Sequence, residues 1–248
     1  MLKQIPNALT SLNLLCGCVA VFFVVSGDLV TAAVFAGLGI FFDFFDGLAA
    51  RLFHAHSEVG LQLDSLADMV TSGLVPGFVM VQLLSKSYTG SYFEIDQLLA
   101  SQDWDAALRS WLPLIGLLVV VASSYRLAKF NVDERQTDRF IGLPTPANTI
   151  LIVSLALILE FQDTPWITEL ILNSWFLVGV TVMSSILLNA ELPLFALKFK
   201  TWDVKNNLKR YLFILFCVLA ILALQFVAIP VIIFVYILLS AVWKDSTA

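Results

Sequence analysis

Charged residues, cysteine and histidine are all scarce in this chain of 248 residues. Only 13% of the residues are charged, with three cysteines and two histidines. The lysines and arginines form no stripe with interleaved aromatic residues, which argues against a nucleic-acid-binding surface. Cys16, Cys18 and Cys217 lie in apolar runs. Because side chains two positions apart on a helix do not face each other, we expect buried thiols rather than a metal-binding pair.

Apolar residues are abundant instead. They make up 59% of the chain, and the mean hydropathy is +0.89. This composition is typical of a polytopic membrane protein. Apolar runs of about 17–25 residues mark transmembrane helices, and we place them at 6–26, 29–53, 59–84, 110–130, 145–162, 168–189, 208–225 and 228–244. We therefore expect an all-α bundle with about eight transmembrane helices.

The end of the chain leaves the number of spans open. Residues 211–243 are almost wholly apolar and too long for one ordinary span, with Pro230 as the natural break. Six or seven spans with additional interfacial helices are the alternatives. If the N-terminus is cytoplasmic, only Lys86 and Arg109 of the 14 lysines and arginines fall on the opposite side. Both termini and the turn at Ala55 are then expected to be cytoplasmic.

Four aspartates interrupt the apolar sequence, although a charge near the bilayer centre costs about 2.5–3.5 kcal/mol. Residues spaced to share one face of the second helix are Asp43, Asp46, Gly47, Ala50 and Arg51. A face of the next helix carries Gly60, Asp64 and Asp68. If the chain folds back at Ala55, the two acidic faces meet, with Asp46 level with Asp64 and Asp43 level with Asp68.

Converging carboxylates repel one another in a low-dielectric interior unless a cation neutralises them. Hard oxygen ligands select Mg²⁺, Mn²⁺ or Ca²⁺ rather than zinc, and two such ions would cancel four negative charges. Paired divalent ions suit phosphoryl transfer, and Arg51 is placed to hold a phosphate oxygen. The competing interpretations are carboxylates paired with basic residues, a helix pair that projects into water, and the transport site of a divalent-cation transporter.

The run D-x2-D-G-x2-A-R-x8-G-x3-D-x3-D resembles the signature of the CDP-alcohol phosphatidyltransferase family. The resemblance implies that all four aspartates bind divalent ions (Mg²⁺ or Mn²⁺), with Asp68 also the general base. It implies a CDP pocket lined by Gly47, Ala50 and Arg51, to which we add Gly60. The reaction implied is attack by an alcohol on the β-phosphate of a CDP-linked lipid, which releases CMP.

Two further stretches resemble the phosphatidylserine synthase branch of that family. "PNALTSLNLLCG" matches its first-helix pattern, so we expect Asn7, Thr10 and Asn13 to bind the cytosine and ribose, or else to bond within the bundle. "RLAKFN" places Arg126, Lys129 and Asn131 at the cytoplasmic end of the fourth helix. A serine carboxylate needs a cation, and Lys129 departs from the arginine that the branch usually carries. Ordinary charge anchoring is the alternative for these residues.

These patterns lead to one prediction for the whole chain. Residues 1–248 form a single membrane domain, with a catalytic core at about 5–190 and architectural helices at about 208–244. The expected substrates are CDP-diacylglycerol and L-serine, and the expected products are phosphatidylserine and CMP. Other alcohols, such as glycerol phosphate, inositol phosphate or choline, remain open as acceptors. The family likeness also implies a homodimer, and the cytoplasmic turn at Ala55 predicts an active site that faces the cytoplasm.

Overall fold

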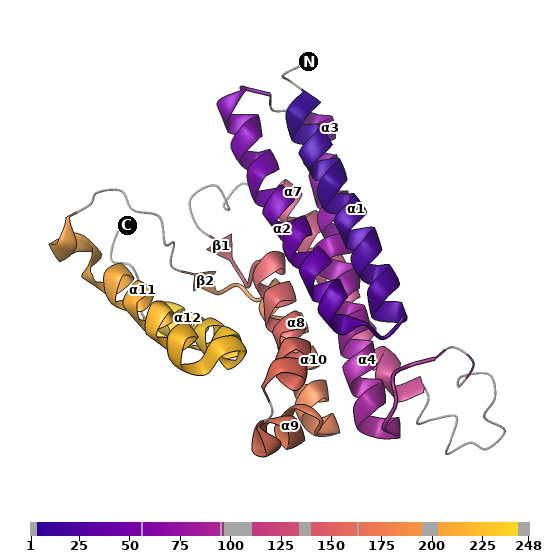
Figure 1. Cartoon of the computed structure of the whole chain (residues 1–248). Helices are drawn as coiled ribbons and strands as arrows, with labels where there is room; N and C mark the ends of the chain where they lie inside the picture. Colours follow the sequence, from indigo (N-terminus) through magenta and orange to yellow (C-terminus); the bar gives the residue numbers. More distant parts are fainter. Residues whose placement is uncertain are drawn as a thin grey trace.

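The computed structural model describes residues 4–55, 57–94, 96, 111–133, 140–162, 164–194 and 203–242. Within these ranges the chain is a bundle of helices, with one short antiparallel strand pair (Figure 1). The predicted all-α class is therefore confirmed for the described part of the chain.

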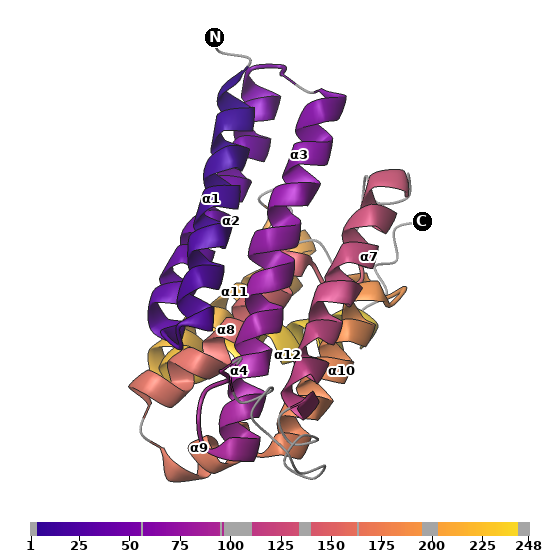
Figure 2. The same cartoon turned by 90° about the vertical axis from the view of Figure 1, so that its right-hand side faces the viewer.

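The N-terminal half carries the acidic signature on three long helical segments. These are α1 (Ile5–Val25), α2 (Leu29–Leu52), and a rod made of α3 (Glu58–Asp68), the π-helix η2 (Met69–Leu74) and α4 (Val75–Thr89). Asp28 begins α2 by accepting a hydrogen bond from the backbone N–H of Thr31 at 3.0 Å. This interaction with Thr31 lowers the pKa of Asp28 below its ordinary value. Figure 2 shows α3 continuing through to α4 as one rod beside α1 and α2.

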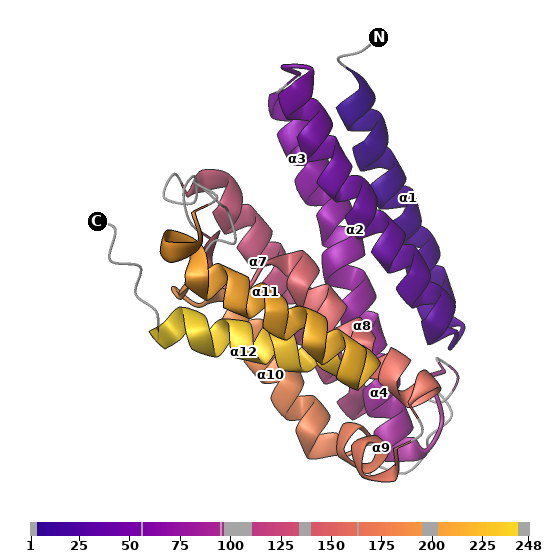
Figure 3. The ribbon, with the colours of Figure 1, turned by 60° about the vertical axis from the view of Figure 1, so that its left-hand side comes forward.

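The second half continues the bundle and adds a pair of apolar helices. Its elements are η3 (Leu112–Leu117), α7 (Leu118–Val132), β1 (Phe140–Ile141), α8 (Thr145–Phe161), α9 (Pro165–Ile171), α10 (Ser174–Asn189), β2 (Pro193–Leu194), α11 (Val204–Leu224), η5 (Gln225–Val227) and α12 (Ala228–Val242). The strands pair Phe140 with Leu194, which joins the α7–α8 and α10–α11 connections. In Figure 3, α11 and α12 lie side by side across the other helices.

Helices fall on every predicted range, but the number of membrane crossings is not confirmed. By length and composition, five helices of the described residues qualify as spans, or six if the pair α9 and α10, bent by 61°, counts as one. At the third predicted span, 59–84, the helix α4 continues past Leu84 to Thr89. The last helices separate at η5, where Gln225 has a φ of +51°, and Pro230 lies in the first turn of α12.

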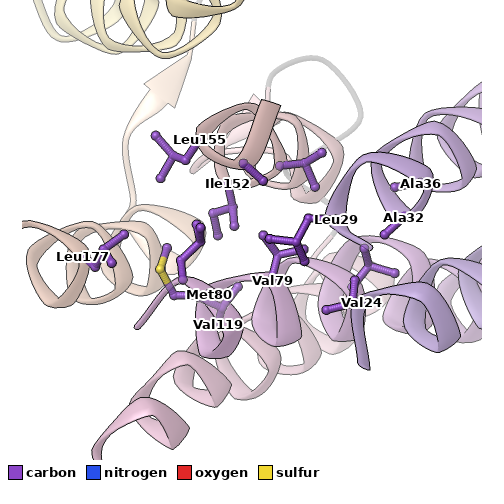
Figure 4. Close-up of a cluster of buried hydrophobic side chains, with 14 of the residues drawn as sticks. Val24, Leu29, Ala32, Ala36, Val79, Met80, Val119, Ile152, Leu155 and Leu177 are labelled. Atoms are coloured by element: carbon purple, nitrogen blue, oxygen red, sulfur yellow. The ribbon is translucent and has the colours of Figure 1, made fainter. Parts of the chain in front are cut away.

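One buried apolar cluster joins α1, α2, α4, α7, α8 and α10 (Figure 4). Its fully buried side chains include Val24, Val79, Met80, Ile152 and Leu177. Because lipid is as apolar as these residues, close packing and not burial from water holds such helices together. Small residues allow this packing: a Cβ on Gly116 would lie 2.7 Å from the backbone nitrogen of Val81. The cluster fixes the helices around the aspartates.

Candidate active site

The turn between α2 and α3 brings three of the four aspartates together. Oxygen atoms of Asp43, Asp64 and Asp68 all lie within 4.8 Å of one another. α2 ends at Leu52 and α3 begins after its N-cap Ser57, so the chain reverses around Ala55 as predicted. The predicted pairing of Asp43 with Asp68 is therefore confirmed, and Asp64 joins the same cluster.

Asp46 is not one of the three clustered residues, and its side chain has a partner on α1. Its side chain is buried, and its Oδ2 accepts a hydrogen bond of 2.6 Å from the hydroxyl of Thr10 on α1. A distance this short is typical of a hydroxyl that donates to an ionised carboxylate. Asp46 and Asp64 nevertheless line the same pocket, as their predicted common depth requires.

The acidic cluster suits a divalent cation. Its donors are hard carboxylate oxygens, and Asp64 Oδ1 is buried without a hydrogen-bond partner. Among the described residues the one salt bridge joins Lys129 to Glu191, so no lysine or arginine there pairs with the aspartates. In the described part of the chain, the four aspartates are therefore not paired with basic residues. Buried carboxylates without a hydrogen-bond donor or a basic partner need a positive charge nearby. A metal ion that prefers oxygen ligands would supply that charge.

Asn13 contacts the cluster from α1. Its side chain is fully buried, and its Nδ2 donates a hydrogen bond of 3.2 Å to Asp68 Oδ1. The backbone carbonyl of Asn13 accepts a hydrogen bond from Thr71, which lies in the π-helix that follows Asp68. The side chain of Thr71 packs against Gly17 and Gly39. A Cβ atom on Gly17 would lie 2.4 Å from the Thr71 side chain, and a Cβ atom on Gly39 would lie 2.6 Å from it, so both positions need glycine. π-helical turns often occur at functional sites, and this one directly follows Asp68.

A pocket of about 150 Å³ opens beside the aspartates, between α1, α2 and the start of α3. Of the residues predicted to bind CDP, it is lined by Asn7, Thr10, Gly47, Ala50 and Gly60. Its other lining residues are Pro6, Asp46, Ala55, Ser57, Leu61 and Asp64. A Cβ on Gly47 would meet no atom within 4 Å, so this side of the pocket is open. The pocket is thus continuous with the acidic site.

Two predicted CDP-binding residues are not among those that line the pocket. Asn13 is buried against Asp68. Arg51 is exposed, and its Nε donates to the carbonyl oxygen of Gly47 at 3.0 Å. This bond holds the Nε atom of Arg51 against α2, one helical turn after Gly47, which lines the pocket.

The three residues predicted to bind serine each have a protein partner. Arg126 is buried, and its Nη1 donates to the carbonyl oxygens of Ile141 and Leu188. Lys129 pairs with Glu191 at 3.4 Å, and Asn131 forms a hydrogen bond with Ser65 on α3. The structure thus brings Asn131 next to the acidic helix, whereas Arg126 and Lys129 contact the end of α10 and the chain that follows it.

Sequence reasoning missed Ser57 and Thr71. Ser57 caps α3, accepting a hydrogen bond from the backbone N–H of Gly60, and it lines the pocket. A serine three residues before a glycine at a helix start is a recognisable capping signal. Thr71 had no comparable signal, since the run "MVTSGL" reads as ordinary apolar helix.

Comparisons with known proteins agree with this geometry. The family model of CDP-alcohol phosphatidyltransferase matches residues 3–243. The chain is 32% identical over 159 residues to the CDP-diacylglycerol–serine O-phosphatidyltransferase of Bacillus subtilis, which covers 62% of this chain and 76% of that protein. It is 29% identical over 214 residues to the enzyme of the same name from Helicobacter pylori, covering 85% of this chain and 78% of the relative.

A third relative, from Mycobacterium tuberculosis, carries the same name and is 29% identical over 202 residues, which is 78% of this chain and 61% of the relative. The long apolar helices and the membrane enzymes to which the chain is similar identify an integral membrane protein. With a family model that spans nearly all its residues, the chain belongs to the CDP-alcohol phosphatidyltransferase family.

Proposed function

We propose that this enzyme transfers a phosphatidyl group from CDP-diacylglycerol to L-serine, producing phosphatidylserine and CMP, in a reaction that depends on divalent metal ions. The observation that carries the proposal is the cluster of Asp43, Asp64 and Asp68, next to a pocket lined by four other signature residues, Asp46, Gly47, Ala50 and Gly60. The names of three relatives, all CDP-diacylglycerol–serine O-phosphatidyltransferases, support serine as the acceptor.

Each signature residue receives a role. Asp43, Asp46, Asp64 and Asp68 hold the divalent ions, which we propose to be two Mg²⁺ or Mn²⁺. When bound, such ions lower the free energy of negative charge on the phosphates and on the departing CMP. Asn7, Gly47, Ala50 and Gly60 line the space for the nucleotide, and Arg51 holds a phosphate oxygen at its edge.

Asp68 removes the proton of the acceptor hydroxyl. An alcohol is a weak nucleophile near neutral pH and needs a base within hydrogen-bond reach. The hydrogen bond from Asn13 occupies Oδ1 of Asp68 and fixes the plane of its carboxylate. Oδ2 is then the oxygen oriented to accept the proton.

For the acceptor, we propose that Arg126, Lys129 and Asn131 bind serine. Both hydrogens of Arg126 Nη1 are used by the carbonyl oxygens of Ile141 and Leu188, at 2.9 and 2.7 Å. A serine carboxylate would therefore bind the Nη2 and Nε edge of the guanidinium group. Asn131 connects this region to the acidic site through Ser65, the neighbour of Asp64. We further propose that the site faces the cytoplasm and that the protein acts as a homodimer.

The choice of acceptor is tested by turnover of CDP-diacylglycerol with a panel of radiolabelled alcohols. We expect the purified protein in detergent to release CMP with serine and Mg²⁺ or Mn²⁺, and to stop when a chelator removes the metal. Turnover with glycerol phosphate, inositol phosphate or choline, but not with serine, would reject serine while leaving the chemistry intact. A cation transporter would release no CMP under these conditions, where no ion gradient exists.

Replacement of Arg126 by lysine tests the proposed carboxylate contact. Lysine keeps the positive charge but lacks the planar fork that serves two carbonyls and a carboxylate together. We expect the KM for serine to rise about tenfold or more, with the KM for CDP-diacylglycerol unchanged.

Arg210→Lys is the matched control. Arg210 donates to Asn207 on α11 and lies outside the proposed site, so both KM values should be unchanged. An equal rise in both KM values for Arg126→Lys would mean that Arg126 only joins the chain segments of Ile141 and Leu188.

A further inference from the structure

Two polar side chains of α1, one turn apart, reach carboxylates on two different helices. Thr10 donates to Asp46 on α2, and Asn13 donates to Asp68 at the end of α3. Both residues are buried, with 3% and 0% of their surface exposed. α1 itself contributes no acidic residue to the site. It contacts the site through hydrogen bonds to aspartates of the other two helices.

The hydroxyl of Thr10 is oriented toward the carboxylate. Thr10 Oγ1 lies 3.0 Å from the carbonyl oxygen of Pro6 and 2.6 Å from Asp46 Oδ2. A hydroxyl has only one hydrogen to donate. The carboxylate of Asp46 is closer than the carbonyl oxygen of Pro6 and is the stronger acceptor, so the hydrogen points toward Asp46. The hydroxyl therefore holds Oδ2 of Asp46 and restricts the rotation of its carboxylate.

The side-chain amide of Asn13 has one possible orientation. A carboxylate oxygen can only accept, so the group that faces Asp68 must be the NH₂. Asn13 Oδ1 is then left buried without a partner, next to Gly39, where a Cβ would come within 3.0 Å of it. A buried amide oxygen that forms no hydrogen bond is costly, and the contact with Asp68 is the compensating interaction.

The backbone of α1 is held in place at the same level. Thr71 donates to the carbonyl oxygen of Asn13 at 3.2 Å, while its side chain lies against Gly17 and Gly39. Rotation or sliding of α1 would break this bond and those to Asp46 and Asp68 together. The three hydrogen bonds therefore fix α1 relative to both acidic helices.

We propose that Thr10 and Asn13 are positioning residues that orient the carboxylates of Asp46 and Asp68 for metal binding, so that α1 prearranges a site whose ligands all come from α2 and α3. This inference rests on the proposed function, which makes those aspartates metal ligands. Groups that hydrogen-bond to metal ligands set the orientation of the ligands, and their loss typically costs about 10–100-fold in metal affinity.

Thr10→Val removes the hydroxyl and keeps the side-chain shape, whereas Thr10→Ser keeps the hydroxyl. We expect Thr10→Val to weaken Mn²⁺ binding about 10–100-fold, measured by electron paramagnetic resonance on the full chain without substrate. Thr10→Ser should restore binding to near the wild-type value. Thr181→Val is the matched control, because Thr181 is also buried, but its hydroxyl donates to the carbonyl oxygen of Leu177 and not to a carboxylate.

Asn13→Leu tests the second contact, with Asn189→Leu as its control. Asn189 also has a buried Oδ1 without a partner, but its Nδ2 donates to backbone carbonyl oxygens. We expect Asn13→Leu to weaken Mn²⁺ binding and to lower kcat while the KM for CDP-diacylglycerol changes little. Asn189→Leu should leave Mn²⁺ affinity unchanged even if it lowers the melting temperature.

The outcomes separate this inference from the proposed function. Wild-type Mn²⁺ binding that Asp64→Asn abolishes, together with weakened binding in Thr10→Val and Asn13→Leu, supports both. If Asp64→Asn abolishes binding and both α1 variants bind Mn²⁺ like the wild type, the positioning role is overturned and the proposed function stands. Wild-type protein that binds no Mn²⁺ would overturn both.

Discussion

Asp68→Asn is expected to lower kcat by about 10²–10⁴-fold while the protein still binds CDP-diacylglycerol. Asparagine has nearly the same shape and can still accept the hydrogen bond that Asn13 donates to position 68. Its amide cannot take the proton of the acceptor hydroxyl. Equilibrium binding of the CDP-linked lipid without acceptor, and CMP release with serine, measure the two properties separately.

Comparison with Asp64→Asn separates the base from a residue that only binds metal. A variant that has lost one metal ligand should recover part of its turnover as the metal concentration rises, because binding is driven by mass action. A variant that has lost the base should not recover, since saturating metal supplies no proton acceptor. Recovery of Asp68→Asn to near the wild-type rate at high Mn²⁺ would contradict the role of Asp68 as base.

The acidic hairpin could be predicted from the sequence because its information is local. Helical periodicity placed the aspartates on one face of each helix, and counting residues from Ala55 placed Asp43 level with Asp68. The glycines of the signature, Gly47 and Gly60, likewise line the pocket beside them. Each of these deductions needed only the geometry of a helix and the position of one turn.

Features that depend on distant partners could not be predicted in this way. The π-helix at Met69–Leu74 accompanies the packing of Thr71 against Gly17 and Gly39, which lie on two other helices. The Nη1 group of Arg126 bonds to Ile141 and Leu188, and no periodicity in the sequence relates these positions. For Thr10 and Asn13, both nucleotide binding and bonding within the bundle were predicted, because the sequence shows polar residues on a helix but not what they face.

Asp43→Asn is expected to raise the melting temperature of the metal-free protein while removing its stabilisation by Mn²⁺ or Mg²⁺. Asp43 contributes an oxygen to a cluster in which all three ligand atoms lie within 4.8 Å of one another. At an effective dielectric constant of about 20, two unit charges about 4 Å apart repel by about 4 kcal/mol. The substitution removes one charge and so part of this repulsion, and we expect a gain on the order of 1–2 kcal/mol.

Melting curves with and without metal measure both parts of this prediction. For the wild-type protein, metal at about 100 times its dissociation constant should stabilise the fold by about 2.7 kcal/mol. Asp28→Asn is the matched control, because Asp28 is an exposed helix cap and asparagine caps equally well. That variant should melt like the wild type and keep its full response to metal.

The two responses are informative because they have opposite signs. Replacing a residue whose role is structural would destabilise the metal-free protein. The loss of stability would then be the same with and without metal. We expect Asp43 instead to destabilise the metal-free protein through repulsion between like charges, and bound metal to remove that repulsion. An Asp43→Asn variant that melts below the wild type without metal, and is still stabilised by Mn²⁺, would show that the cluster is not a metal site.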